Sequence, residues 1–146
     1  MDRKCSVLES ALAPLSNEEV GSFVDHFTSC MDAAYTWELW GAAYIIHGGC
    51  SDDSFMDFRS SLISLGRKVF EAAVSDPGSL ADLGLDPDQA VYEGYGYVAS
   101  SLYKKRSGAA RARRGAHPKT PTGVEWNEED LPRLLPRLWT RYSAAS

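Results

Sequence analysis

The stretch LWGAAYIIHGGCSDDSFMDFRSSLISLGRKVF, residues 39–70, decides the fold of this chain. Its first part belongs to an apolar run from Trp37 to His47, in which two alanines and the lack of alternation favour a helix over a strand. Gly48 can adopt the left-handed conformation that ends a helix. Because this helix is apolar on every side, we expect it at the centre of a helical bundle.

A second helix is expected after the two glycines. Ser51 can cap it, and Asp52 and Asp53 place negative charge at the positive end of the helix dipole. Apolar residues then recur at helical spacing, at Phe55, Phe58, Leu62, Leu65 and Val69. The sequence therefore predicts one helix over 51–74 that forms a central hairpin with residues 37–47.

Further helices are expected on both sides of this hairpin. A short helix covers Lys4–Ala13, and a capping box of Ser16 and Glu19 opens the next one. On the C-terminal side, Asp86 and Pro87 open a helix that we expect to run to Lys105 and to pack across the hairpin.

The last helical segment starts at Asn127, and Pro132 and Pro136 should shorten or kink it. No segment has a convincing strand pattern. The expected fold class is therefore all-α: a compact single domain over residues 1–146, with about five or six helices.

The composition is that of an ordinary globular protein, with 44% hydrophobic and 24% charged residues among 146. No apolar run approaches the roughly 20 residues that cross a bilayer. The three cysteines have neither the even number of a disulfide framework nor the paired spacing of a zinc site. We expect a soluble, cytoplasmic protein without a metal, a cofactor or a membrane partner.

Positive charge is concentrated in one segment of an acidic chain. The net charge is −5, yet seven of the 15 basic residues lie between Lys104 and Lys119, where no acid occurs. Glycines and prolines make residues 104–123 a loop. Nucleic-acid binding is disfavoured because the segment lacks interleaved aromatic residues and the acidic remainder would repel a duplex. A solvated, mobile loop is expected instead.

Paired carboxylates and one arginine form the candidate site. Asp52 and Asp53 either serve only as helix caps or act as acid, base or ligand toward a cationic group. Arg59 lies on the same side of the helix as Asp52, and it can pair with Asp52 or Glu93, or bind a carboxylate or phosphate. An inward-facing Glu93 would have a raised pKa unless Arg59 paired with it.

Other residues border this cluster or are set aside. Ser51, Trp40 and Tyr44 are expected at its edge as ligand-binding residues. The segment EGYGYVA contains a G-x-G-x-x-A pattern, but a dinucleotide site requires a preceding strand, and these residues are expected inside a helix.

Taken together, GGCSDDSFMDFR, LSNEEVGSFVDHF, EGYGYVA and GVEWNEEDLPRLLPRLWTRY make this chain resemble the family known as domain of unknown function 4240, over roughly residues 8–142. The resemblance implies a small, mainly helical bacterial-type domain and carries no agreed reaction. The positions matched by motif are Trp40, Gly48, Gly49, Cys50, Ser51, Asp52, Asp53, Phe58, Arg59, Glu93, Trp126 and Tyr142.

Two departures from the family pattern bear on the site. An initial helix with a Phe-Trp pair is missing, and Ser61 stands where family members usually have a Trp. If that Trp covers a pocket in the family, the pocket is more open in this chain.

Two classes of function follow from these residues. The first is a binding or accessory module that recognises a small polar ligand, a peptide or a protein partner through Asp52, Asp53, Arg59 and Glu93. The second is a small enzyme that uses the paired carboxylates for acid–base chemistry on a basic or polar substrate, for example in a tailoring step of a biosynthetic pathway. The module is favoured because no nucleophile, histidine base or cofactor motif accompanies the carboxylates.

Overall fold

Helix α3 (Trp37–His47) has the bounds that the sequence predicts and lies in the main core of the protein. The Thr36 hydroxyl accepts a hydrogen bond from the Leu39 N–H at 3.0 Å and caps the helix. Gly48 ends it in the left-handed conformation, with φ of 74°. The computed structural model describes residues 1–143.

Helix α4 (Asp52–Ile63) begins as expected but is shorter than predicted. The Ser51 hydroxyl accepts from the Ser54 N–H at 3.1 Å, and Phe55, Phe58 and Leu62 are buried. The single helix predicted over 51–74 is wrong. Gly66 adopts a positive φ of 95°, which an α-helix cannot contain, and a separate helix α5 (Arg67–Ser75) follows.

The helix predicted over 86–105 is also divided. Asp86 caps α6 (Pro87–Ala90) as expected, but this helix has only one turn. Gly94, with φ of 124°, redirects the chain into a 3₁₀ turn, η2 (Tyr95–Tyr97), and α7 (Val98–Ser107) follows. The G-x-G-x-x-A pattern therefore spans a turn rather than a helix, and no strand precedes it within the described residues.

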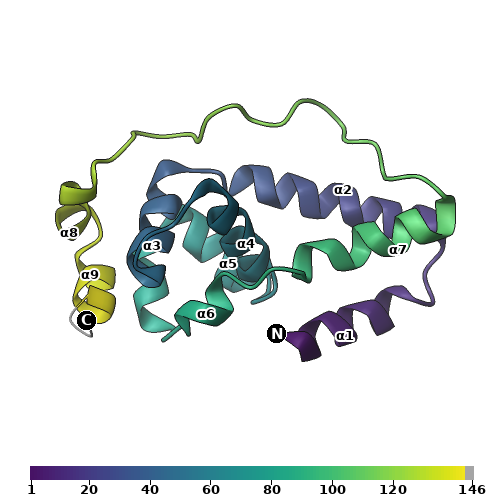
Figure 1. The fold of residues 1–146 in the computed structure, drawn as a ribbon, viewed down its shortest axis with the longest axis horizontal. Coiled ribbons are helices and arrows are strands. Elements are labelled where there is room, and N and C mark those ends of the chain that lie inside the picture. Colours follow the sequence, from purple (N-terminus) through teal and green to yellow (C-terminus); the bar gives the residue numbers. More distant parts are fainter. Residues whose placement is uncertain (144–146) are drawn as a thin grey trace.

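The segment 86–105 packs across the hairpin only in its first part, where α6 contacts α3 and α4 and η2 contacts α4. Helix α7 packs instead against α1 (Asp2–Leu12) and α2 (Asn17–Ala33). Figure 1 shows α7 lying alongside α2, with α1 on its other side. A second, smaller core fills this layer, centred on the buried Leu12, Val20 and Ala99. The predicted capping box of Ser16 and Glu19 opens α2.

A long extended segment, residues 108–127, connects the two ends of the molecule; we call it the strap. In Figure 1 it runs from the end of α7, past α2, to the C-terminal helices. A parallel bridge between Thr36 and Thr122 fixes its far end, and the Trp126 indole N–H donates to the Trp37 carbonyl.

The C-terminal helices cover α3. They are α8 (Leu131–Leu134) and α9 (Pro136–Ser143), divided near Pro136 as the sequence predicts, and a 3₁₀ turn, η3 (Glu128–Asp130), precedes them. Gly41 allows the close approach, because a Cβ there would lie 3.0 Å from Leu131 and 3.1 Å from Trp126.

The all-α class is confirmed, but the expected number of helices was too low. Residues 1–143 contain nine α-helices and three 3₁₀ helices, of which η1 (Pro77–Asp82) follows α5. Glycines at positive φ divide two of the predicted helices, and this accounts for much of the difference. None of the helices in this range is long and apolar enough to cross a membrane.

Candidate functional site

Arg59 is the most unusual residue of the core, because it is a charged side chain that is only 4% exposed. Its guanidinium carbon lies 4.5 Å from the ring centroid of Tyr35 and 4.8 Å from that of Phe55. Its Nη1 donates to the Met31 carbonyl at 2.8 Å, and its Nε donates to the Phe55 carbonyl at 3.4 Å. Helices α2 and α4 thus hold this guanidinium between two rings and two carbonyls.

The charge of Arg59 has no direct counter-ion. No carboxylate oxygen among residues 1–143 lies within the 4.0 Å of an ion pair with it. Burial lowers the pKa of Arg59, and the more distant Asp52 opposes this shift. A guanidinium has five N–H groups, and the two hydrogen bonds above leave three unused. Its Nη2 is not among the fully buried unpartnered atoms, so it keeps contact with solvent.

A cavity of about 260 Å³ lies beside Arg59. Helix α2, helix α4, the turn before α7 and the strap all contribute to its wall. The lining includes Phe27, Asp32, Asp57, Ser60, Arg113 and His117. Concave sites of this kind, mostly apolar with a few convergent polar groups, are where small ligands usually bind.

Ser60 adds an unsatisfied polar group to this wall. It is 5% exposed, and its hydroxyl has no hydrogen-bond partner among the described residues. Gly96 lies directly against it, because a Cβ at this glycine would come within 3.0 Å of the Ser60 oxygen. Buried hydroxyls are normally paired, so the Ser60 hydroxyl, covered by Gly96, is an exception among the buried polar groups next to the cavity.

Asp57 is the second charged group of the cavity without a partner. It is half-buried and forms neither a hydrogen bond nor an ion pair within residues 1–143. Burial raises the pKa of Asp57, and the negative charges of Glu93 and Asp53 raise it further. This carboxyl can therefore accept a cationic group or exchange a proton.

The strap closes one side of the cavity and is tied to α2 by ion pairs. Arg113 pairs with Asp32, and the His117 ring packs edge-on against Tyr35 with centroids 5.9 Å apart. Arg111 of the strap donates two hydrogen bonds to Asp25 of α2, at 2.8 and 3.2 Å.

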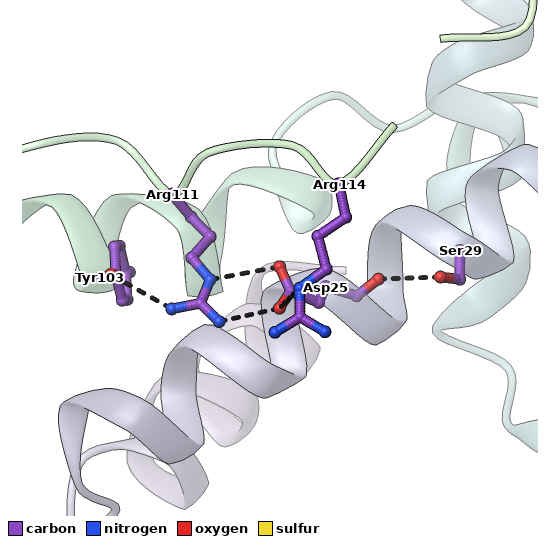
Figure 2. Close-up of polar contacts among 5 residues, drawn as sticks. All are labelled: Asp25, Ser29, Tyr103, Arg111 and Arg114. Carbon is purple, nitrogen blue, oxygen red and sulfur yellow. Dashed lines mark hydrogen bonds and ion pairs between the residues drawn. The ribbon is translucent and has the colours of Figure 1, made fainter. Parts of the chain in front are cut away.

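Figure 2 shows Asp25 between Arg111 and Arg114. The Nε of Arg114 lies 3.4 Å from the Asp25 carboxylate. Arg111 also donates to the Tyr103 hydroxyl at 3.3 Å. The Arg111 hydrogen bonds lower the pKa of Asp25. Three of the seven basic residues of the segment, Arg111, Arg113 and Arg114, thus pair with acids of α2. The mobility of the segment in solution stays a prediction.

The structure brings only part of the predicted cluster together. Asp52 accepts a hydrogen bond from the Tyr35 hydroxyl at 3.3 Å, and Tyr35 in turn lies under Arg59. Asp53 and Glu93 are exposed, and neither pairs with Arg59. Their negative charges raise the pKa of Asp57. The expected ion pair of Arg59 with Asp52 or Glu93 is therefore absent from residues 1–143.

The expected edge residues have structural contacts instead. Trp40 stacks on Phe55 at 5.1 Å and donates its indole N–H to the Cys50 carbonyl at 2.9 Å. Tyr44 packs against Trp126 at 5.3 Å, and its hydrogen bond to Glu128 raises its pKa. Ser51 caps α4. None of these three residues lines the cavity beside Arg59.

Sequence reasoning missed Asp57, Ser60 and His117 as cavity residues. The spacing of Asp57, one turn after Asp53 and two residues before Arg59, was an available signal. No local pattern pointed to His117, because it reaches the cavity from the strap.

The other reactive groups give little support for catalysis through a thiol or a metal. Burial, with the charges of Asp52 and Asp57, raises the pKa of Cys50 to about 12, so its thiol stays protonated near neutral pH. Within residues 1–143, no group of three or more His, Cys, Asp or Glu side chains is placed to hold a metal ion.

Comparison with known proteins places the chain in a family without a described activity. The family model described as "Protein of unknown function (DUF4240)" matches residues 1–105. This range contains Asp57, Arg59 and Ser60 and ends before the strap. No curated protein and no solved structure matches the chain.

Proposed function

We propose that this chain, which belongs to the DUF4240 family of proteins of unknown function, is a small helical binding module that holds the anionic group of a small polar ligand beside Arg59. The ligand is either a free small molecule or the end of a peptide; in both cases the group bound by Arg59 is a carboxylate or a phosphate. This proposal contains fewer residues than the site expected from the sequence. Asp52 contacts Tyr35, the ring under Arg59, and Asp53 lies outside the cavity.

One observation carries the proposal: a guanidinium that is 4% exposed, lines a cavity and has no ion pair. Taking a charge out of water is costly unless a counter-charge compensates it. The Tyr35 and Phe55 rings and two carbonyls compensate it only in part. A planar guanidinium fork with unused donors matches the geometry of a carboxylate or phosphate.

A second function, catalysis, is favoured by a different observation. Asp57 has a raised pKa and lines the same cavity, which is the usual setting of a general acid or base. His117 is also in the wall, with its Nδ1 2.7 Å from the Pro118 carbonyl. An enzyme of this kind would bind its substrate through Arg59 and move a proton through Asp57. NMR that detects chemical conversion of a bound compound would distinguish such an enzyme from a binding module.

The cytoplasm is the compartment that we propose. The thiols of Cys5, Cys30 and Cys50 are all free of disulfides. Unpaired, partly buried cysteines fit a reducing compartment.

Calorimetric titration with inorganic phosphate and with small mono- and dicarboxylates tests the binding function. We expect at least one of these anions to bind the wild type and to lose affinity about tenfold or more in Arg59→Met. Arg67→Met is the matched control, because Arg67 is 88% exposed and pairs only with Glu71. Equal affinity in the wild type and in Arg59→Met, or no binding of any anion, would contradict the proposal.

A further inference from the structure

We infer that the ligand of this cavity is a small zwitterion, such as an amino acid or a short peptide, whose cationic group is held by Asp57 while Arg59 holds its anionic group. This inference rests on the proposed function and names the ligand class of the same site.

The first support is that two opposite charges line one cavity without meeting. Arg59 is buried and Asp57 is half-buried, and no ion pair joins them within 4.0 Å. Neither charge is among the causes that shift the pKa of the other. The two groups therefore lie at separate points of the wall, and a ligand must carry two charges to satisfy both.

The second support is that the remaining charged pair of the cavity is already neutralised. Asp32 and Arg113 also line it, and they form an ion pair with each other. Arg59 and Asp57 are thus the only carboxylate and guanidinium groups left unpaired among the described residues of the lining. A ligand with a single negative charge would satisfy Arg59 but add to the negative charge around Asp57.

The third support is the acidic surroundings of Asp57. Asp53 lies one helical turn before it, and the negative charge of Glu93, in the loop before η2, also raises the pKa of Asp57. An ammonium group near Asp57 would have three carboxylates around it and would relieve their mutual repulsion.

The size of the cavity narrows the class further. About 260 Å³ lies just below the usual range of small-molecule sites, which is roughly 300–1,000 Å³. This volume suits an amino acid or a dipeptide better than a nucleotide. Phe27 and Met31 supply apolar surface for the carbon chain between the two charges.

The test compares matched probes by calorimetric titration of the full chain. Glycine, β-alanine, 4-aminobutyrate, 5-aminopentanoate and glycylglycine carry both charges at different separations. Butyrate and butylamine each carry one. Each probe is titrated into the wild type, Asp57→Asn, Arg59→Met and the control Asp88→Asn, which alters an exposed carboxylate of α6.

We expect one probe with both charges to bind at least about tenfold more tightly than butyrate and butylamine. Both Asp57→Asn and Arg59→Met should remove this advantage, and Asp88→Asn should keep it. Circular dichroism and the unfolding midpoint of each variant show that a loss of binding is not a loss of folding.

The outcomes separate the two proposals. If butyrate binds as tightly as every zwitterion and Asp57→Asn changes nothing, the zwitterion is excluded and the anion site at Arg59 stands. If butylamine binds through Asp57 without any role for Arg59, the site is a cation site and the zwitterion is again excluded. If no carboxylate or phosphate binds through Arg59, the proposed function fails as well.

Discussion

The guanidinium of Arg59 lies over the ring of Tyr35, with its central carbon 4.5 Å from the ring centroid. The Tyr35 hydroxyl donates to Asp52 at 3.3 Å, so Tyr35 contacts both the guanidinium of Arg59 and the carboxylate of Asp52, whose charge stabilises that guanidinium. Burial is the main cause that raises the pKa of Tyr35. This arrangement fixes the guanidinium from one side and leaves its unused donors for a ligand.

Replacement of Arg59 by methionine should remove anion binding without a loss of stability. Methionine keeps the length and much of the packing of the side chain, while the cost of the buried charge disappears. We expect the free energy of unfolding to stay equal or to rise by roughly 1 kcal/mol or more. Arg59→Ala should instead lose about 2–5 kcal/mol, because it leaves a cavity against Tyr35 and Phe55. Urea denaturation measures both.

A large loss of stability in Arg59→Met would show that the charge itself holds the core together. Arg59 would then have a structural role in the core, which would contradict the prediction. Arg67→Met, at an exposed position, gives the baseline for removing an arginine from a helix.

Asp57→Asn should stabilise the protein at neutral pH. Burial, Glu93 and Asp53 raise the folded-state pKa of Asp57 above its ordinary value of 3.8. The folded state then binds the proton more tightly, so stability falls as pH rises from the unfolded to the folded pKa. The wild type should therefore be less stable than Asp57→Asn at pH 7, and the difference should vanish at acidic pH. Thermal unfolding over a pH series measures this.

Ionisation of Asp57 should also control ligand affinity, which should rise with pH where stability falls. A cationic group binds the charged form of Asp57, so affinity for a zwitterion should rise with pH through the folded-state pKa. Arg113 and His117 also face the cavity. Calorimetry of the wild type and Asp57→Asn over a pH series measures this, and a pH dependence that persists unchanged in Asp57→Asn would contradict the prediction.

Variants of Ser51 and Asp53 should distinguish the effect of helix capping on stability from the effect of charge on ligand affinity. The Ser51 hydroxyl accepts from the Ser54 N–H, so Ser51→Ala should cost about 1 kcal/mol of stability and leave ligand affinity unchanged. Asp53 is exposed, and Asp53→Asn should change stability by less than about 0.5 kcal/mol. A modest loss of affinity is expected for this variant, since Asp53 adds to the negative potential at Asp57. Chemical denaturation and calorimetry on the same samples test both statements.

Local signals predicted those parts of the fold that local chemistry determines. The apolar run over 37–47, the Gly48 end and the Ser51 cap lie where the sequence places them, because each depends on neighbouring residues. The break at Gly66 was missed because the apolar spacing continues through Leu65 and Val69 as if the helix were intact. A stripe on one face does not distinguish one long helix from two.

The candidate site depends on contacts between distant segments, and the sequence predicted less of it. Arg59 was singled out as part of the candidate site, and it is buried in the core. Its carbonyl partner Met31 lies on α2, and His117 lies on the strap, so neither follows from the pattern around Arg59. Trp40 and Tyr44 were expected at the edge of the site. Trp40 stacks on Phe55 and Tyr44 packs against Trp126, and neither residue lines the cavity.

The ion pairs of the strap should contribute stability that disappears at low pH. Hydrogen bonds from Arg111 lower the pKa of Asp25 below its ordinary value of 3.8. A depressed folded-state pKa gives stability that is present above the unfolded pKa and is lost as pH falls through the folded one. The difference in unfolding free energy between the wild type and Asp25→Asn should therefore be constant above about pH 5 and shrink below about pH 4.

Salt provides an independent check on the same contact. Asp25 and Arg111 are each about one-fifth exposed, with side-chain values of 19% and 21%, so about 1 M NaCl should reduce the difference without removing it. Asp88→Asn, at an exposed acid outside the strap contacts, should show neither dependence. Proteolysis by trypsin at the strap should become faster in Asp25→Asn, because the segment that carries Arg111 and Arg114 is released from α2. Equal cleavage rates at pH 7 would mean that the strap is held by other contacts, such as the Arg111–Tyr103 hydrogen bond and the Thr36–Thr122 bridge, rather than by the ion pairs of Asp25.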